Sequence, residues 1–145
     1  MESGILLTGL VLLALVAGPI IYMHYKRSRR QRFLENSLAQ FAIANKLQIS
    51  NYDLWNQQYA IGIDDSASYI VHLQISGKTV TDIKVPLSEK DMALVVKKEK
   101  GIALTIRNTV GVKATLEFYS GTELDTMEEE TRLAEKWADI INKRN

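Results

Sequence analysis

The segment 59-YAIGIDDSASYIVHLQI-75 carries the pattern that decides the fold. Before its polar centre, Tyr59, Ile61 and Ile63 fall on one face, and after it the odd-numbered residues from 69 to 75 do the same. Such strict alternation is typical of β-strands that bury one face. The intervening DDSAS has the length and composition of a hairpin turn. The segment therefore predicts two neighbouring antiparallel strands.

Further short apolar segments extend this pattern toward the C-terminus. In the segment 79–87, Pro86 indicates an edge strand or the end of a strand. In the segment 91–98, Met92, Leu94 and Val96 are expected to form the apolar face. Before the opening segment, ISNYDLWNQQ is expected to form a turn, because Ser50, Asn51 and Asp53 favour turns. The strand segments predict an antiparallel β meander or small barrel of about six to seven strands; they are 59–64, 68–75, 79–87, 91–98, 102–108 and 112–119.

The C-terminal segment predicts an amphipathic helix that closes the strands. Thr126 and Glu129 have the spacing of a capping box, and residues 128–130 place three glutamates in the first turn. One apolar face recurs at helical spacing and is expected to plug the barrel. It consists of Leu133, Trp137, Ile140 and Ile141.

This order of strands and a final helix resembles the pleckstrin-homology-like (PH-like) superfold. The segments YAIGIDDSASYIVHLQ and LEFYSGTE…LAEKWADIINK also resemble uncharacterised bacterial membrane-anchored proteins, and the resemblance covers about residues 55–143. It implies a barrel of seven strands plugged by Trp137, one strand more than the six segments above, and DLWNQQ is the candidate for the seventh. The phosphoinositide-binding members of this family carry Lys and Arg in the first hairpin loop. Here that loop contains Asp64 and Asp65 and no basic residue, which argues against phosphoinositide binding.

The N-terminal residues suggest a membrane anchor. The run from Ile5 to Met23 contains no charged residue, and only four residues precede it, Met1, Glu2, Ser3 and Gly4. None of them is basic, which argues against a cleaved signal peptide. We therefore predict a single transmembrane helix over residues 1–25. The basic collar that follows places the N-terminus outside and the C-terminal domain in the cytoplasm, at the cell membrane. This collar consists of Lys26, Arg27, Arg29, Arg30 and Arg32.

The rest of the chain divides into two predicted parts. Residues 26–49 combine the collar with an amphipathic helix, whose stripe contains Leu34, Leu38 and Phe41. Residues 50–145 form the predicted PH-like domain. The sequence leaves open whether the amphipathic helix continues the transmembrane helix.

Composition and motifs argue against most kinds of chemistry. The 145-residue chain has a net charge of +1 and no cysteine, so thiol nucleophiles and Cys-based zinc sites are excluded. Beyond Arg32 the chain carries more acidic than basic residues, so a nucleic-acid partner is not expected. Asp64 and Asp65 lack the ligand spacing of a calcium loop, and His72 has no recognisable nucleophile motif around it. We expect no enzyme activity, cofactor, metal or small-molecule substrate.

The sequence therefore favours a membrane-tethered binding or scaffolding module with the lipid bilayer and an unidentified protein as partners. A strand edge or the groove between barrel and helix would make the contact, and Trp55, in a polar setting, is a candidate contact. An alternative function is sensing of anionic lipids through the collar and the hairpin residues Lys97, Lys98 and Lys100. A further alternative is an enzyme of unrecognised type, with His72 as the main candidate.

Overall fold

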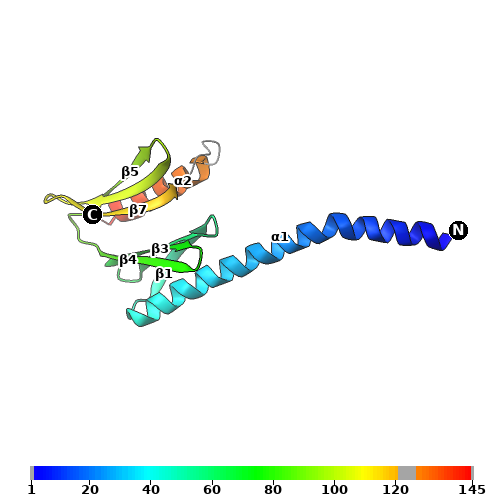
Figure 1. The fold of residues 1–145 in the computed structure, drawn as a ribbon. Helices are drawn as coiled ribbons and strands as arrows, with labels where there is room; N and C mark the ends of the chain where they lie inside the picture. The colour runs from blue at the N-terminus through cyan, green and yellow to red at the C-terminus, as the bar shows by residue number, and fades with distance from the viewer. Residues whose placement is uncertain (1, 121–126, 145) are drawn as a thin grey trace.

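The structure is a computed structural model that describes residues 2–120 and 127–144 (Figure 1). The side chains of some residues in the N-terminal helix, among them His24 and Arg27, lie outside the described part, as does Thr126 of the predicted capping box. The elements in chain order are α1 (Glu2–Ala44), β1 (Ile49–Trp55), β2 (Tyr59–Asp64), β3 (Tyr69–Ser76), β4 (Thr79–Pro86), β5 (Met92–Lys98), β6 (Gly101–Arg107), β7 (Val112–Ser120) and α2 (Met127–Asn142).

The strands form two antiparallel sheets that face each other, with α2 beside the second sheet (Figure 1). The first sheet has the order β1-β2-β3-β4 and the second has the order β5-β6-β7. The predicted α+β class, the antiparallel pairing, the C-terminal helix and the position of Pro86 at the end of an edge strand are confirmed. The predicted barrel is wrong, because neither sheet closes: the chain crosses from β4 to β5 without pairing these strands.

The main hydrophobic core lies between the two sheets and under α2. Ile61 and Ile63 of β2 contribute from the first sheet, as the alternation of β2 predicted. In β3 the prediction is reversed: Ile70, from the face opposite its main apolar one, lies in this core, whereas Val71 and Leu73 face α1. The second sheet contributes Ile102, Leu104, Ile106, Leu116 and Phe118, and α2 contributes Ala134, Trp137, Ala138 and Ile141. Because α2 has one apolar face, this packing removes that face from water.

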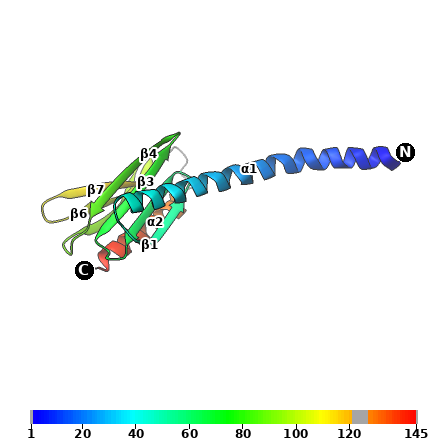
Figure 2. The same cartoon turned by 90° about the horizontal axis from the view of Figure 1, so that it is seen from below.

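A second, smaller core lies on the opposite face of the first sheet. Leu34 and Leu38 of α1 are buried there against Ala60, Val71 and Leu73, and Figure 2 shows the C-terminal part of α1 lying across this sheet. β2 is therefore covered on both faces, which explains why all six of its residues are buried. The predicted amphipathic helix packs on its own domain through the stripe that its sequence indicated.

A left-handed residue ends α1 and directs the chain into β1. Lys46 has a φ of 56°, its amide donates to the carbonyl of Ile43 at 3.2 Å, and the Leu47 amide donates to the carbonyl of Ala42 at 2.8 Å. This pair of bonds forms a Schellman motif. Leu47 then packs against the α1 core, which fixes the direction of entry into the first sheet.

The membrane interpretation requires correction. A spanning helix needs ~20 consecutive apolar residues, and in the part of the chain that the structure describes no helix is long and apolar enough to cross a membrane. The described positions of the run include Thr8, Gly9, Gly18 and Pro19. On this finding, the predicted transmembrane helix and the localisation as a single-pass protein with an outside N-terminus and a cytoplasmic domain are wrong. α1 instead continues without interruption to Ala44.

Two strand assignments also differ from the sequence interpretation. The segment read as a turn forms β1, whose polar residues fit an edge strand because three of its seven residues are exposed. In β5 the face that packs on the core is the opposite of the one predicted. Ala93 and Val95 pack on the core, whereas Met92, Leu94 and Val96 are 38–50% exposed. Because this strand is apolar on both faces, alternation alone could not orient it.

Candidate functional site

The candidate site is a cleft of about 590 Å³ where α1, the β1–β2 turn and the start of α2 meet. Its residues come from segments far apart in the sequence, so only the fold assembles it. Apolar residues and polar or acidic residues share its lining. They are Gln31, Leu34, Leu54, Trp55, Asn56, Gln57, Glu129, Glu130 and Leu133.

The β1–β2 turn forms one wall of the cleft in a backbone conformation that favours glycine. Asn56 and Gln57 have φ values of 50° and 54°, and the Gln58 amide donates to the Trp55 carbonyl at 3.2 Å. Two consecutive left-handed residues in a hairpin link normally favour Asn-Gly, so Gln57, in this three-residue link, is held in the left-handed region at a cost of order 1 kcal/mol. Such strain persists only where neighbouring contacts determine the conformation.

Glu130 holds this turn to α2. The Asn56 side-chain amide donates to Glu130 Oε1 at 2.9 Å, although the two residues are 74 positions apart. Glu130 is 5% exposed, and its other oxygen, Oε2, is buried without a hydrogen-bond partner among the described residues. Because an unsatisfied buried acceptor typically costs 1–3 kcal/mol, a donor that reached this oxygen from the cleft would be favoured.

Trp55, the candidate partner contact, lines the same cleft and is half-buried. Its indole Nε1 donates to the Phe118 carbonyl at 2.7 Å, which links the first sheet to β7. Its ring stacks on Tyr59 at 5.3 Å and on Phe118 at 4.7 Å between centroids. These contacts hold Trp55 in one orientation, so the cleft has a rigid apolar wall.

A second set of bonds joins the same strand to α2. Trp137 is fully buried, and its Nε1 donates to Asp53 Oδ2 at 2.9 Å. Lys136 forms an ion pair with the same oxygen at 2.6 Å. Within the predicted plugging face, Trp137 and Ile141 are buried in the main core, and Leu133 and Ile140 pack at its margin. This face closes the space between two sheets.

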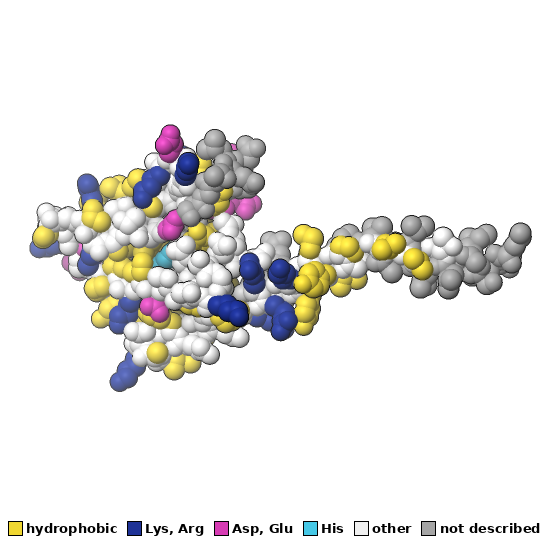
Figure 3. Space-filling view, viewed as in Figure 1, with side chains coloured by type: hydrophobic (Ala, Val, Ile, Leu, Met, Phe, Trp, Pro, Cys, Tyr) yellow, Lys and Arg dark blue, Asp and Glu magenta, His cyan; other side chains and the backbone are white. Residues whose placement is uncertain are grey.

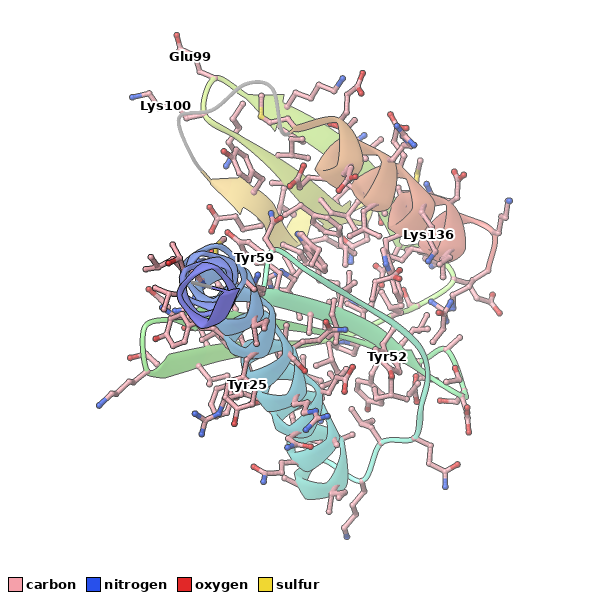
Figure 4. All side chains as sticks on the ribbon, turned by 90° about the vertical axis from the view of Figure 1, so that its right-hand side faces the viewer. Tyr25, Tyr52, Tyr59, Glu99, Lys100 and Lys136 are labelled. Atoms are coloured by element: carbon pink, nitrogen blue, oxygen red, sulfur yellow. The ribbon has the colours of Figure 1, made fainter. Side chains whose placement is uncertain are left out.

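The predicted basic residues lie outside the cleft and in two separate places. Lys26, Arg29, Arg30 and Arg32 are exposed on α1 where it leaves the domain (Figure 3), and the side chain of Arg27 is outside the described part. Lys97, Lys98 and Lys100 are exposed at the β5–β6 hairpin. In Figure 4 this hairpin tip, marked by Glu99 and Lys100, lies well away from Tyr25 of α1. The collar and the hairpin do not form one continuous surface.

Asp64, the last residue of β2, holds the β2–β3 turn through hydrogen bonds. Asp64 is buried and accepts bonds from the Ser66 hydroxyl and from the Ser68 and Tyr69 amides. Burial by itself raises the pKa of Asp64, but the bonds from Ser66, Tyr69 and Ser68 outweigh it, so the pKa is lowered overall. Asp65 is exposed beside it. Among the residues that the structure describes, no three His, Cys, Asp or Glu side chains gather as metal ligands would.

His72 is buried between the two sheets, away from the cleft lining. It is 2% exposed, lies beside the rings of Trp55, Tyr59 and Phe118, and shares a 2.8 Å hydrogen bond between its Nε2 and the Glu117 carbonyl. Since a carbonyl only accepts, Nε2 carries the proton. Burial lowers the pKa of His72, and the Glu117 carbonyl and charge act more weakly in the opposite direction.

This burial predicts a specific pH dependence of stability. As the pH falls below the ordinary His value of about 6.5, the unfolded chain binds a proton before the native protein does, so the free energy of unfolding decreases. His72→Gln retains a donor for the Glu117 carbonyl and removes the titration. We expect this variant to lose less stability than the wild type between about pH 7 and pH 5 in urea denaturation. Parallel pH profiles would contradict the prediction.

Sequence reasoning identified Trp55 in this site but missed its polar partners. Glu130 was interpreted only as part of the acidic first turn of α2, and Asn56 as part of a turn-rich segment. The signal that distinguishes Glu130 is its place on the helix, because the apolar stripe at Leu133 and Trp137 continues back to position 130 at helical spacing. No sequence signal pairs it with Asn56.

Comparisons of the chain with protein-family models, with curated proteins and with solved structures found no match.

Proposed function

We propose that this protein is a non-catalytic protein-binding module that takes a basic side chain of a partner protein into the cleft between α1, the β1–β2 turn and α2. The observation that carries the proposal is the buried Glu130 carboxylate, whose Oε1 is fixed by Asn56 and whose Oε2 has no partner among the described residues. An arginine or lysine side chain supplies the missing donor, and hydrogen bonds to charged groups are the stronger ones.

The rest of the lining supports a partner of mixed character. Leu34, Leu54 and Leu133 offer apolar contact to the aliphatic part of such a side chain. Glu129 adds a second negative charge at the rim, where it is exposed. The Asn56–Glu130 bond and the Trp55 stack hold the walls, and the partner's side chain must displace the groups that cover Glu130 Oε2 to reach it.

We also propose that the domain belongs to the PH-like superfold. Support comes from the order of a four-stranded sheet, a three-stranded sheet and a final helix, and from a buried tryptophan, Trp137, on that helix. PH-like domains include protein-binding modules, which agrees with the proposed function, but the function is argued from the cleft and not from the fold.

The experiment compares two peptide probes on the full-length chain. Acetyl-Leu-Arg-amide and its citrulline analogue differ at one side chain, where a neutral urea group of the same shape replaces the charged guanidinium. We expect the arginine probe to shift the NMR signals of the Trp55 indole and the Asn56 side-chain amide, with little effect from the citrulline probe. Glu130→Gln keeps the shape and the acceptor for Asn56, and should weaken arginine binding roughly tenfold, because one charge-assisted bond is lost.

The matched control is Glu135→Gln, which removes the same charge from an exposed position of α2. This variant should bind the arginine probe as the wild type does. Equal binding of both probes would show that the charge of the side chain plays no part in binding. Equal loss of affinity in both variants would show that general charge and not Glu130 is responsible. Either result would reject the proposed site.

A further inference from the structure

The outer edge of β4 carries a row of free backbone groups. The Ile75 amide donates to the Gln58 carbonyl on the β2 side, and the Leu87 amide donates to the Ser68 carbonyl between β3 and β4. With the antiparallel register of β3 and β4, the amides and carbonyls of residues 79, 81, 83 and 85 therefore point toward β3. Those of Val80, Asp82, Lys84 and the carbonyl of Pro86 point outward.

This edge differs from the corresponding edge of the second sheet. In β5 the amide and carbonyl of Ala93 are both bonded by the side-chain amide of Asn142, at 2.8 and 3.0 Å. No hydrogen bond among the described residues reaches the outward groups of β4, and α1 packs mainly on β1 and β2. An exposed edge of this length is a template for another strand.

We infer that a second copy of this chain occupies the edge, with the two β4 strands antiparallel about a two-fold axis at Ile83. In this register Asp82 faces Lys84 of the second copy, and Lys84 faces its Asp82. The backbone amides and carbonyls of Asp82 and Lys84 point away from β3, so each Asp82–Lys84 pair exchanges two backbone hydrogen bonds. The Val80 amide additionally donates to the carbonyl of Pro86 of the second copy. Pro86 has no backbone N–H to donate, and in this register it only accepts a hydrogen bond.

Charge selects this register over its neighbours. Shifting the strands by one bonded pair would place either Asp82 opposite Asp82 or Lys84 opposite Lys84, and like charges directly opposite are destabilising. In the inferred register both charges are compensated. Ile83, which is 36% exposed in one copy, meets its symmetry mate at the axis and loses apolar surface to water.

The first test uses the absence of cysteine from the chain. Residues facing each other at a non-hydrogen-bonded pair have Cα atoms about 4.5 Å apart, within disulfide range. Ile83→Cys should therefore form a covalent dimer in most of the protein on mild oxidation. Thr81→Cys lies on the same face, but its symmetry mate is displaced by about 13 Å along the strand, so it should cross-link only at background level.

The second test reverses the charges and measures mass by sedimentation equilibrium. Asp82→Lys and Lys84→Asp should each weaken dimerisation at least tenfold, because each places like charges together. Asp82→Lys/Lys84→Asp should restore the dimer, and a mixture of the two single variants should form the heterodimer. Asp139→Lys, an equal change at an exposed position of α2, should leave dimerisation unchanged.

Three outcomes would overturn the inference. They are a monomer at every concentration tested, equal cross-linking of the two cysteine variants, and a dimer that Asp82→Lys does not affect. Asp82, Lys84 and Thr81 are exposed, so these substitutions preserve the fold, and circular dichroism checks that they do. Because the edge and the cleft share no residue, failure of this inference leaves the proposed function untouched.

Discussion

Trp137→Ala is expected to lower the free energy of unfolding by about 3–5 kcal/mol, the usual cost of removing a large buried aromatic side chain. Trp137 is the largest fully buried side chain in the described part of the protein. It joins α2 to both sheets, through the main core and through its bond to Asp53. Urea denaturation followed by far-UV circular dichroism measures the change.

Trp137→Phe separates packing from hydrogen bonding at this position. Phenylalanine keeps most of the apolar contact but cannot donate to Asp53, which remains paired with Lys136. Since Asp53 is then not left without a partner, we expect a smaller loss of about 1–2 kcal/mol. If the alanine and phenylalanine variants were equally destabilised, the bond to Asp53 and not core packing would dominate, contrary to the expectation.

Lys113→Met is expected to be the second large change, lowering the free energy of unfolding by about 3–5 kcal/mol. Lys113 pairs with Asp91 Oδ2 at 2.7 Å, and the Asp91 side chain is fully inaccessible to solvent. The Ser88 amide also donates to this oxygen at 2.7 Å. Methionine fills a similar volume but leaves the buried carboxylate without its cation, and that charge is costly in the interior.

The stability deficit of Lys113→Met is expected to depend on pH in a specific way. Burial alone raises the pKa of Asp91, but the bonds from Lys113 and Ser88 lower it overall. The wild-type contribution is therefore present above the unfolded pKa of 3.8 and is lost as the pH falls through the lower native value. In Lys113→Met the ionised Asp91 lacks the bond from Lys113 that stabilises it in the wild type. Protonation of Asp91 removes this difference, so the deficit relative to wild type should shrink as the pH falls.

The matched control for this prediction is Asp91→Asn/Lys113→Met. Asparagine keeps an acceptor for the Ser88 amide without the charge, so the double variant should be more stable than Lys113→Met alone. A deficit that stays constant from neutral to acidic pH, or no recovery in the double variant, would mean that the ion pair is not the cause.

Sequence periodicity predicted the parts of the fold in which one face is apolar and the other polar. The stripe of α2 at Trp137 and Ile141 and the alternation of Ile61 and Ile63 in β2 were both oriented correctly. Pattern alone predicted a turn in place of β1, because an edge strand buries too little to show alternation. Only the resemblance to the PH-like superfold suggested a strand within DLWNQQ. β5 was placed with Met92 inward because both of its faces are apolar.

The candidate site was less predictable for a different reason. Trp55 was identified because a large aromatic residue in a polar segment is unusual. The partners that define the cleft, Asn56 and Glu130, come from β1–β2 and from α2, and their meeting depends on how the second sheet packs on the first. Local patterns carry no information about such a long-range pairing.

The continuity of α1 sets a fixed length scale for the whole molecule. The helix runs from Glu2 to Ala44, and its first anchoring residue in the domain is Leu34, so about 32 residues, or roughly 48 Å at 1.5 Å per residue, precede the anchor. Gln31, one turn before the anchor, lines the cleft. One unbroken helix thus joins residues far outside the domain to the cleft, so the N-terminal part of α1 and the wall at Gln31 belong to a single element.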